Sequence, residues 1–99
     1  MIVDTHCHLY FEELNKDLDG VISRANDLGV NTFICIGTNL NDSYESLSLA
    51  QKYKSIYATA GIHPHDAQDV TGDYLKELYK LLDNEKIVAV GEMGLDYFK

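Results

Sequence analysis

Two histidines separated by a single position, His6 and His8, are the residues of this sequence best suited to bind a metal ion. They follow the apolar stretch Met1-Ile2-Val3, which predicts a buried strand. Because alternate side chains of a strand project from the same face, both imidazoles would point the same way. Each could bind one divalent cation through a ring nitrogen, and Asp4 on the same face could orient a ligand by hydrogen bonding. In the competing interpretation, one histidine caps the strand and the other packs.

A carboxylate, Glu92, lies in a second polar segment, Gly91-Glu92-Met93-Gly94-Leu95-Asp96-Tyr97. A carboxylate has two oxygens and can bridge two cations, which a neutral imidazole with one free lone pair cannot do. We therefore predict Glu92 as a third metal ligand. The alternative is a carboxylate that pairs with a basic partner or caps a helix. Asp96 and Tyr97 could orient a ligand or simply hold the loop.

A third polar segment, Gly61-Ile62-His63-Pro64-His65, contains the only proline of the chain. Pro64 restricts the backbone where His63 and His65 leave a predicted strand. An imidazole at this point could hydrogen-bond a substrate phosphate or carbonyl, so we predict His63 and His65 as substrate-binding residues. The alternative is a loop histidine whose hydrogen bonds go to the backbone, and it stays open above all for His65.

Alternating helix and strand patterns predict an α/β fold of parallel βα repeats. Apolar residues recur three or four positions apart in the helical stretches, and short β-rich apolar runs lie between them. Such continuous apolar runs are typical of parallel strands buried on both faces. After the first strand we predict a helix over 16–28, a strand over 32–37, a helix from Asn41 or Asp42 to about Tyr53, a strand over 55–61, a helix over 73–84 and a strand over 87–91.

The order of these elements predicts four parallel strands joined by right-handed crossovers, with sequence neighbours side by side. In parallel α/β sheets, chemistry collects beyond the carboxyl ends of the strands. The three polar segments follow the first, third and fourth predicted strands, so we expect them to meet at one rim and form a site. No linker or low-complexity tract interrupts the pattern, and residues 1–99 are expected to form a single domain.

The composition, with 45% hydrophobic and 24% charged residues, is ordinary for a soluble protein, and it predicts neither a membrane span nor a signal peptide. The net charge of −8 argues against a generic basic nucleic-acid surface. It is compatible with a nuclease, because bound divalent cations reverse the local field at a phosphate. Cys7 and Cys35 form no CxxC pair, so we expect reduced thiols and a cytoplasmic protein.

In three motifs the sequence resembles the TatD family of metal-dependent deoxyribonucleases. The motifs are Asp4-Thr5-His6-Cys7-His8-Leu9 and the two polar segments that contain His63 and Glu92, in the family's order. The resemblance implies a TIM-type (β/α)8 barrel with a one- or two-metal site that hydrolyses phosphodiester bonds in DNA or a related substrate. It also implies that His6 and His8 hold one cation, that a catalytic Glu92 bridges to a second, and that His63 faces substrate. Magnesium, manganese and zinc all stay open as the metal.

The length departs from this family pattern, because TIM-type barrels typically need ~250 residues and this sequence stops after the fourth predicted strand. We therefore expect the first half of a barrel, the amino-terminal portion of a larger metal hydrolase. The 99 residues alone are expected to be weak or inactive and to self-associate through open sheet edges. A second function class stays open, a non-catalytic metal-binding or interaction fragment that takes up metal without turnover.

Overall fold

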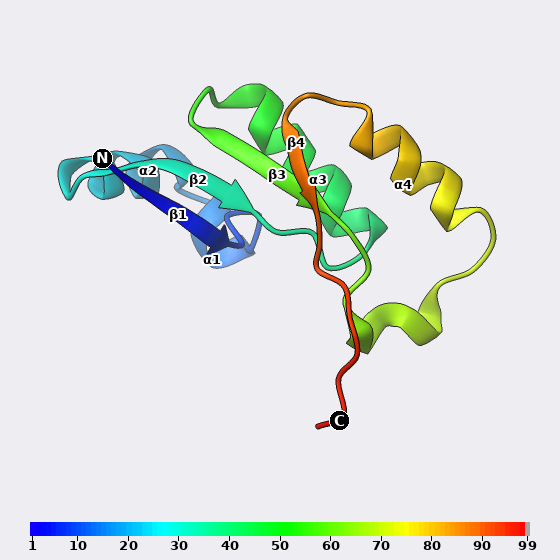
Figure 1. The fold of residues 1–99 in the computed structure, drawn as a ribbon. Coiled ribbons are helices and arrows are strands. Elements are labelled where there is room, and N and C mark those ends of the chain that lie inside the picture. Colours follow the sequence, from blue (N-terminus) through cyan, green and yellow to red (C-terminus); the bar gives the residue numbers. More distant parts are fainter. Residues whose placement is uncertain (99) are drawn as a thin grey trace.

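A computed structural model describes residues 1–98 and contains one sheet of four parallel strands. The strands are β1 (Ile2–Cys7), β2 (Val30–Cys35), β3 (Ile56–Ala60) and β4 (Ile87–Val90). They lie in the order β1-β2-β3-β4, so each strand pairs with its neighbour in sequence, as the βαβ pattern predicted. Figure 1 shows the strands side by side, with the chain passing through helix between consecutive strands.

Helices connect all four strands. α1 (Glu12–Asn15) and α2 (Leu18–Asp27) lead from β1 to β2, and α3 (Leu40–Lys52) leads from β2 to β3. The 3₁₀ helix η1 (Pro64–Asp69) and α4 (Tyr74–Leu82) lead from β3 to β4. The helices predicted over 16–28 and 73–84 are present and shorter by one or two residues at each end. The periodicity did not predict η1, which has Pro64 in its first turn, where the missing N–H costs nothing.

The predicted cap of α3 was wrong. Its N-cap is Asn39 rather than Asn41 or Asp42, because the Asn39 side chain accepts a hydrogen bond from the backbone N–H of Asp42 at 2.8 Å. Asp42 therefore lies inside the first turn, where the helix N-terminus favours negative charge. This placement also brings the Asp42 carboxylate to the loop that follows β2, where it accepts a hydrogen bond from the Thr38 hydroxyl.

The core is centred on the two inner strands. Cys35 of β2 and Ile56, Ala58 and Ala60 of β3 have no exposed surface, and Leu81 of α4 belongs to the same buried cluster. The outer strands β1 and β4 are mostly exposed, since each has one neighbouring strand within residues 1–98. Burial on both faces therefore holds for β3 and not for the outer strands. No helix in this part of the chain is both long and apolar enough to span a membrane.

Candidate metal centre

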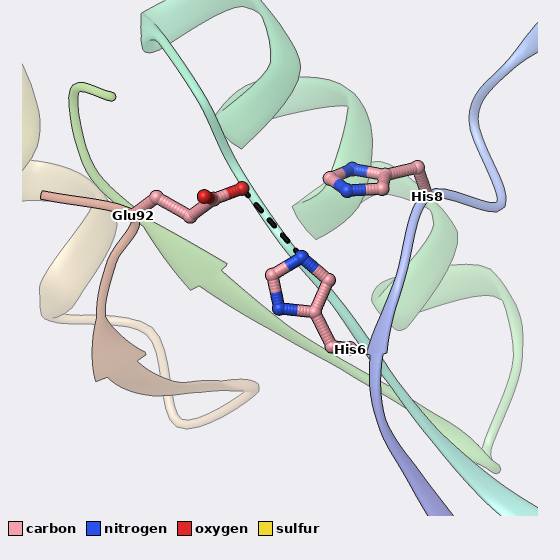
Figure 2. Close-up of side chains that lie close together, drawn as sticks. All are labelled: His6, His8 and Glu92. Atoms are coloured by element: carbon pink, nitrogen blue, oxygen red, sulfur yellow. Dashed lines mark ion pairs between the residues drawn. The ribbon is translucent and has the colours of Figure 1, made fainter. Parts of the chain in front are cut away.

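Three potential metal ligands, His6, His8 and Glu92, converge at the carboxyl ends of the outer strands (Figure 2). His6 lies in β1, His8 follows the last residue of that strand, and Glu92 lies two residues beyond β4. One potential ligand atom from each side chain lies within 4.8 Å of the others. The parallel sheet thus brings the two ends of the sequence together, and the role of these residues as ligands stays a prediction.

The carboxylate of Glu92 lies between two imidazoles. Its Oε2 is 3.7 Å from Nε2 of His6, and its Oε1 is 3.6 Å from Nε2 of His63. The side chain is 28% exposed, so the carboxylate can be reached from solvent. Because one oxygen faces His6 and the other faces His63, Glu92 can contact a cation beside His6 while its second oxygen stays close to His63.

His8 is held by two aromatic residues that follow it in the chain. Its ring stacks on Phe11, with centroids 4.9 Å apart and planes 10° apart, and its Nδ1 lies 2.9 Å from the Tyr10 hydroxyl oxygen. The same hydroxyl lies 2.9 Å from the carbonyl oxygen of Ile36 and 3.2 Å from Oδ2 of Asp42. Burial is the main cause that raises the pKa of Tyr10 above its ordinary value, and the nearby Asp42 carboxylate is the second. The hydroxyl is therefore protonated at neutral pH.

The second histidine pair uses its ring nitrogens differently. Nδ1 of His63 accepts a hydrogen bond from the backbone N–H of His65 at 2.9 Å, which leaves Nε2 facing Glu92. Nε2 of His65 lies 2.6 Å from Oδ2 of Asp96. The Phe98 N–H and His65 both hydrogen-bond Asp96 and lower its pKa. Asp96 therefore contacts His65 rather than the three potential ligands, and the ring of His65 is held by a side chain rather than by backbone.

The loop after β2 supplies none of the three potential ligands, yet it positions three parts of the site. The backbone carbonyls of residues 36–38 accept, in order, hydrogen bonds from the Tyr10 hydroxyl, the Glu92 N–H and the His63 N–H. The last two bonds are both 2.7 Å long. No unusual side chain marks this loop in the sequence, and every residue carries a backbone carbonyl, so its role could not be predicted.

Close packing of the neighbouring loops fixes the backbone of Glu92. The buried Oγ1 of Thr59 accepts a hydrogen bond from the Gly37 N–H at 3.2 Å and donates one to the carbonyl oxygen of Gly91 at 2.9 Å. The backbone of Glu92 packs closely against Gly61, and only glycine fits there, because a Cβ would lie 2.6 Å from the carbonyl oxygen of Glu92. The end of β3 thus holds the segment that carries Glu92.

Two residues beside the first histidine pair have other partners. The Cys7 thiol donates to the carbonyl oxygen of Ile34 at 3.4 Å, and a hydrogen bond with Cys35 together with burial raises its pKa. Cys7 is not among the three residues whose potential ligand atoms converge. The Asp4 carboxylate accepts a hydrogen bond from the backbone N–H of His6 at 3.1 Å, so it steadies the strand and not an imidazole.

Tyr10, Asp42 and Thr38 were absent from the site predicted by sequence. Tyr10 lies two residues beyond His8, and this closeness to a predicted ligand was the one available signal. Asp42 and Thr38 gave none. Asp42 is 32 positions from Tyr10 in the sequence and reaches it only after β1 and β2 pair, and Thr38 joins the site through its hydrogen bond to Asp42.

Comparison with known proteins identifies the family of this chain. A family model described as TatD related DNase matches residues 3–99. The chain belongs to this family. Its TatD relatives include YabD of Bacillus subtilis (strain 168), named as an uncharacterized metal-dependent hydrolase, which is 40% identical over 97 residues. The 3'-5' ssDNA/RNA exonuclease TatD of Escherichia coli (strain K12) is 37% identical over 94 residues.

The chain spans less than half the length of these TatD relatives. The matched region covers 98% of this chain and 38% of YabD, and 95% of this chain and 36% of Escherichia coli TatD. Among solved structures, the TatD homologue YJJV from Escherichia coli K12 superposes with a TM-score of 0.90 at 35% identity, over 99% of this chain and 39% of that one. The prediction of parallel βα repeats that form the first half of a TIM-type barrel is thereby confirmed.

Proposed function

We propose that this protein is a metal-dependent nuclease that hydrolyses phosphodiester bonds in DNA, with His6, His8 and Glu92 as metal ligands. The convergence of these three side chains within 4.8 Å is the observation that carries the proposal. Membership of the TatD related DNase family supports it. Two relatives support it as well: YabD is named as a metal-dependent hydrolase, and TatD of Escherichia coli as a 3'-5' ssDNA/RNA exonuclease.

The donor set fits a divalent metal ion. Two imidazoles and one carboxylate make up the ligand combination of several catalytic zinc sites, and a carboxylate also suits magnesium or manganese. A bound divalent ion neutralises charge on a phosphoryl group and makes water more acidic. In a chain with a net charge of −8, such an ion also supplies the positive field that a polyanionic substrate requires.

We propose that His63 and His65 bind the substrate beside the metal centre. Their side chains are 25% and 42% exposed, so both can be reached from solvent. Nδ1 of His63 already accepts a hydrogen bond, and the hydrogen of the neutral ring is therefore on Nε2. That N–H can be donated to a phosphoryl oxygen, while Glu92 keeps its place through its own backbone hydrogen bond.

Two broader proposals complete this assignment. The match to 39% of YJJV supports residues 1–99 as the amino-terminal part of one barrel domain. Cys7 and Cys35 are free thiols, and we propose a cytoplasmic location, where thiols stay reduced.

The direct test is hydrolysis of single-stranded DNA by the purified full-length protein. After chelation and dialysis, activity should be lost, and added manganese or magnesium should restore it. Glu92→Gln should take away the metal-restored activity, whereas Tyr53→Phe, at a surface position away from the site, should keep it. Metal uptake by the wild-type protein without any hydrolysis would contradict the nuclease proposal and favour the non-catalytic binding module.

The 99 residues by themselves are expected to show at most weak turnover. A hard divalent cation takes about six ligands, some of them waters, and the described residues bring three within reach of one another. Leu75 and Tyr79 of α4 and Val90 of β4 are exposed, and such apolar surface favours association between chains. Size-exclusion chromatography followed by a nuclease assay of the monomer tests both points. Robust turnover by that monomer would contradict this expectation.

A further inference from the structure

We infer that Tyr10 is a positioning residue that holds His8 in its Nδ1–H tautomer and leaves Nε2 as the nitrogen that binds metal. The inference rests on the proposed metal centre and adds to it the group that decides which ring nitrogen of His8 serves as a ligand. Among the three potential ligands, His8 is the one within hydrogen-bond distance of the Tyr10 hydroxyl, so Tyr10 acts through His8.

The Tyr10 hydroxyl has more possible hydrogen-bond partners than it has hydrogens. Its oxygen has three neighbours within hydrogen-bond distance, the carbonyl oxygen of Ile36 at 2.9 Å, Oδ2 of Asp42 at 3.2 Å and Nδ1 of His8 at 2.9 Å. A backbone carbonyl and a carboxylate can only accept, and the hydroxyl carries a single hydrogen. That hydrogen is directed to these two acceptors, so the bond to His8 needs a hydrogen on Nδ1.

The opposite tautomer leaves the hydroxyl in a poor environment. If Nδ1 of His8 carried no hydrogen, Tyr10 would donate to it, and the hydroxyl oxygen would then face the Ile36 carbonyl and the Asp42 carboxylate without a hydrogen between them. A close contact between partly buried hydrogen-bond acceptors with no hydrogen between them is unfavourable, above all when one of them is charged. The Nδ1–H tautomer satisfies all these groups at once.

Neighbouring groups keep both partners of this hydrogen bond in place. Phe11 stacks on the ring of His8, and His6 meets it edge-on at 5.2 Å, so rotation of the ring is restricted. On the other side, the Asp42 carboxylate accepts a hydrogen bond from the Thr38 hydroxyl. A metal-binding histidine commonly donates its second ring N–H to a group that fixes its tautomer, and here Tyr10 fills that role.

The first test reads the tautomer directly in the metal-free protein. Full-length protein labelled with ¹⁵N-histidine is measured by long-range ¹H–¹⁵N NMR at about pH 8.5, where ordinary imidazoles are neutral, and the His8 signal is assigned from its loss in His8→Gln. We expect the Nδ1–H pattern for His8 in the wild type and a shift toward the Nε2–H pattern in Tyr10→Phe. Tyr53→Phe is the matched control, because its hydroxyl also donates to a carboxylate, Asp19, at 2.6 Å.

The second test is calorimetric titration with manganese. Tyr10→Phe should weaken binding by about 10- to 100-fold, while the Tm of its metal-free form stays close to that of Tyr53→Phe. An Nε2–H tautomer in the wild type, or equal manganese affinity in wild type and Tyr10→Phe, would overturn the inference. If the wild-type protein binds manganese without hydrolysing DNA, only the proposed function fails, because the tautomer and the affinity are measured without turnover.

Discussion

Two pairs of histidines have the same spacing in this chain, His6 with His8 and His63 with His65. Both pairs lie at the carboxyl end of a strand. The first pair continues the extended course of β1, and its rings lie 5.2 Å apart. The second pair flanks Pro64 at the start of η1, and its rings lie 4.4 Å apart. Proximity of the imidazoles is thus common to both pairs and does not by itself separate a metal-binding pair from another kind.

The pairs differ in how their ring nitrogens are used. In the first pair, one nitrogen of His8 contacts Tyr10, and both residues keep a potential ligand atom close to Glu92. In the second pair, the chain itself occupies Nδ1 of His63 with a backbone N–H and Nε2 of His65 with Asp96. Each ring of the second pair still has one further nitrogen, so the difference lies in where the nitrogens are placed. Both imidazoles of the first pair have a ligand atom within 4.8 Å of one on Glu92, whereas His65 of the second pair contacts Asp96.

The largest expected effect is loss of metal from the first pair. His6→Ala removes a proposed ligand and should weaken manganese binding by more than about 100-fold, because removal of a group that merely orients a ligand costs about 10- to 100-fold. Calorimetric titration of the full-length protein measures the change, and His65→Ala is the matched control in the second pair. Equal losses in the two variants would break the distinction between the pairs.

An intermediate effect is expected at His63. His63→Ala should slow hydrolysis of single-stranded DNA by about 100-fold, as loss of one positioned hydrogen-bond donor to a reacting group does. Metal stoichiometry, measured by atomic absorption, should stay that of the wild type. Loss of metal would make His63 a ligand and join the two pairs functionally, and unchanged metal and activity would reduce it to a loop histidine.

The smallest effect is expected from the exposed pair of His65 and Asp96. Exposed ion pairs contribute little, so His65→Ala and Asp96→Ala should each lower kcat/KM by less than about 10-fold and leave the Tm unchanged. The double variant should match the single variants, because either change removes the same contact. An additive loss would show that the two side chains act on substrate independently.

The sequence by itself determined the architecture and the composition of the rim. Helical periodicity and short apolar runs predicted four parallel strands in sequence order. The element ends differ from prediction by at most two residues, and the α3 cap at Asn39 by two or three. The rule that parallel strands present their carboxyl ends together was enough to gather His6, His8 and Glu92. These signals are local or periodic, so a single sequence contains them.

Only the tertiary structure decided how each ring nitrogen is used. The bond from Tyr10 to the Ile36 carbonyl joins residues 26 positions apart, and the contact with Asp42 spans 32 positions. Residues 36–38 hold the Glu92 and His63 backbones through carbonyl oxygens, a group that every amino acid carries. Such contacts have no period and no residue signature. They arise from the register between β1 and β2 and from the position of the first turn of α3, which are set when the strands and helices pack.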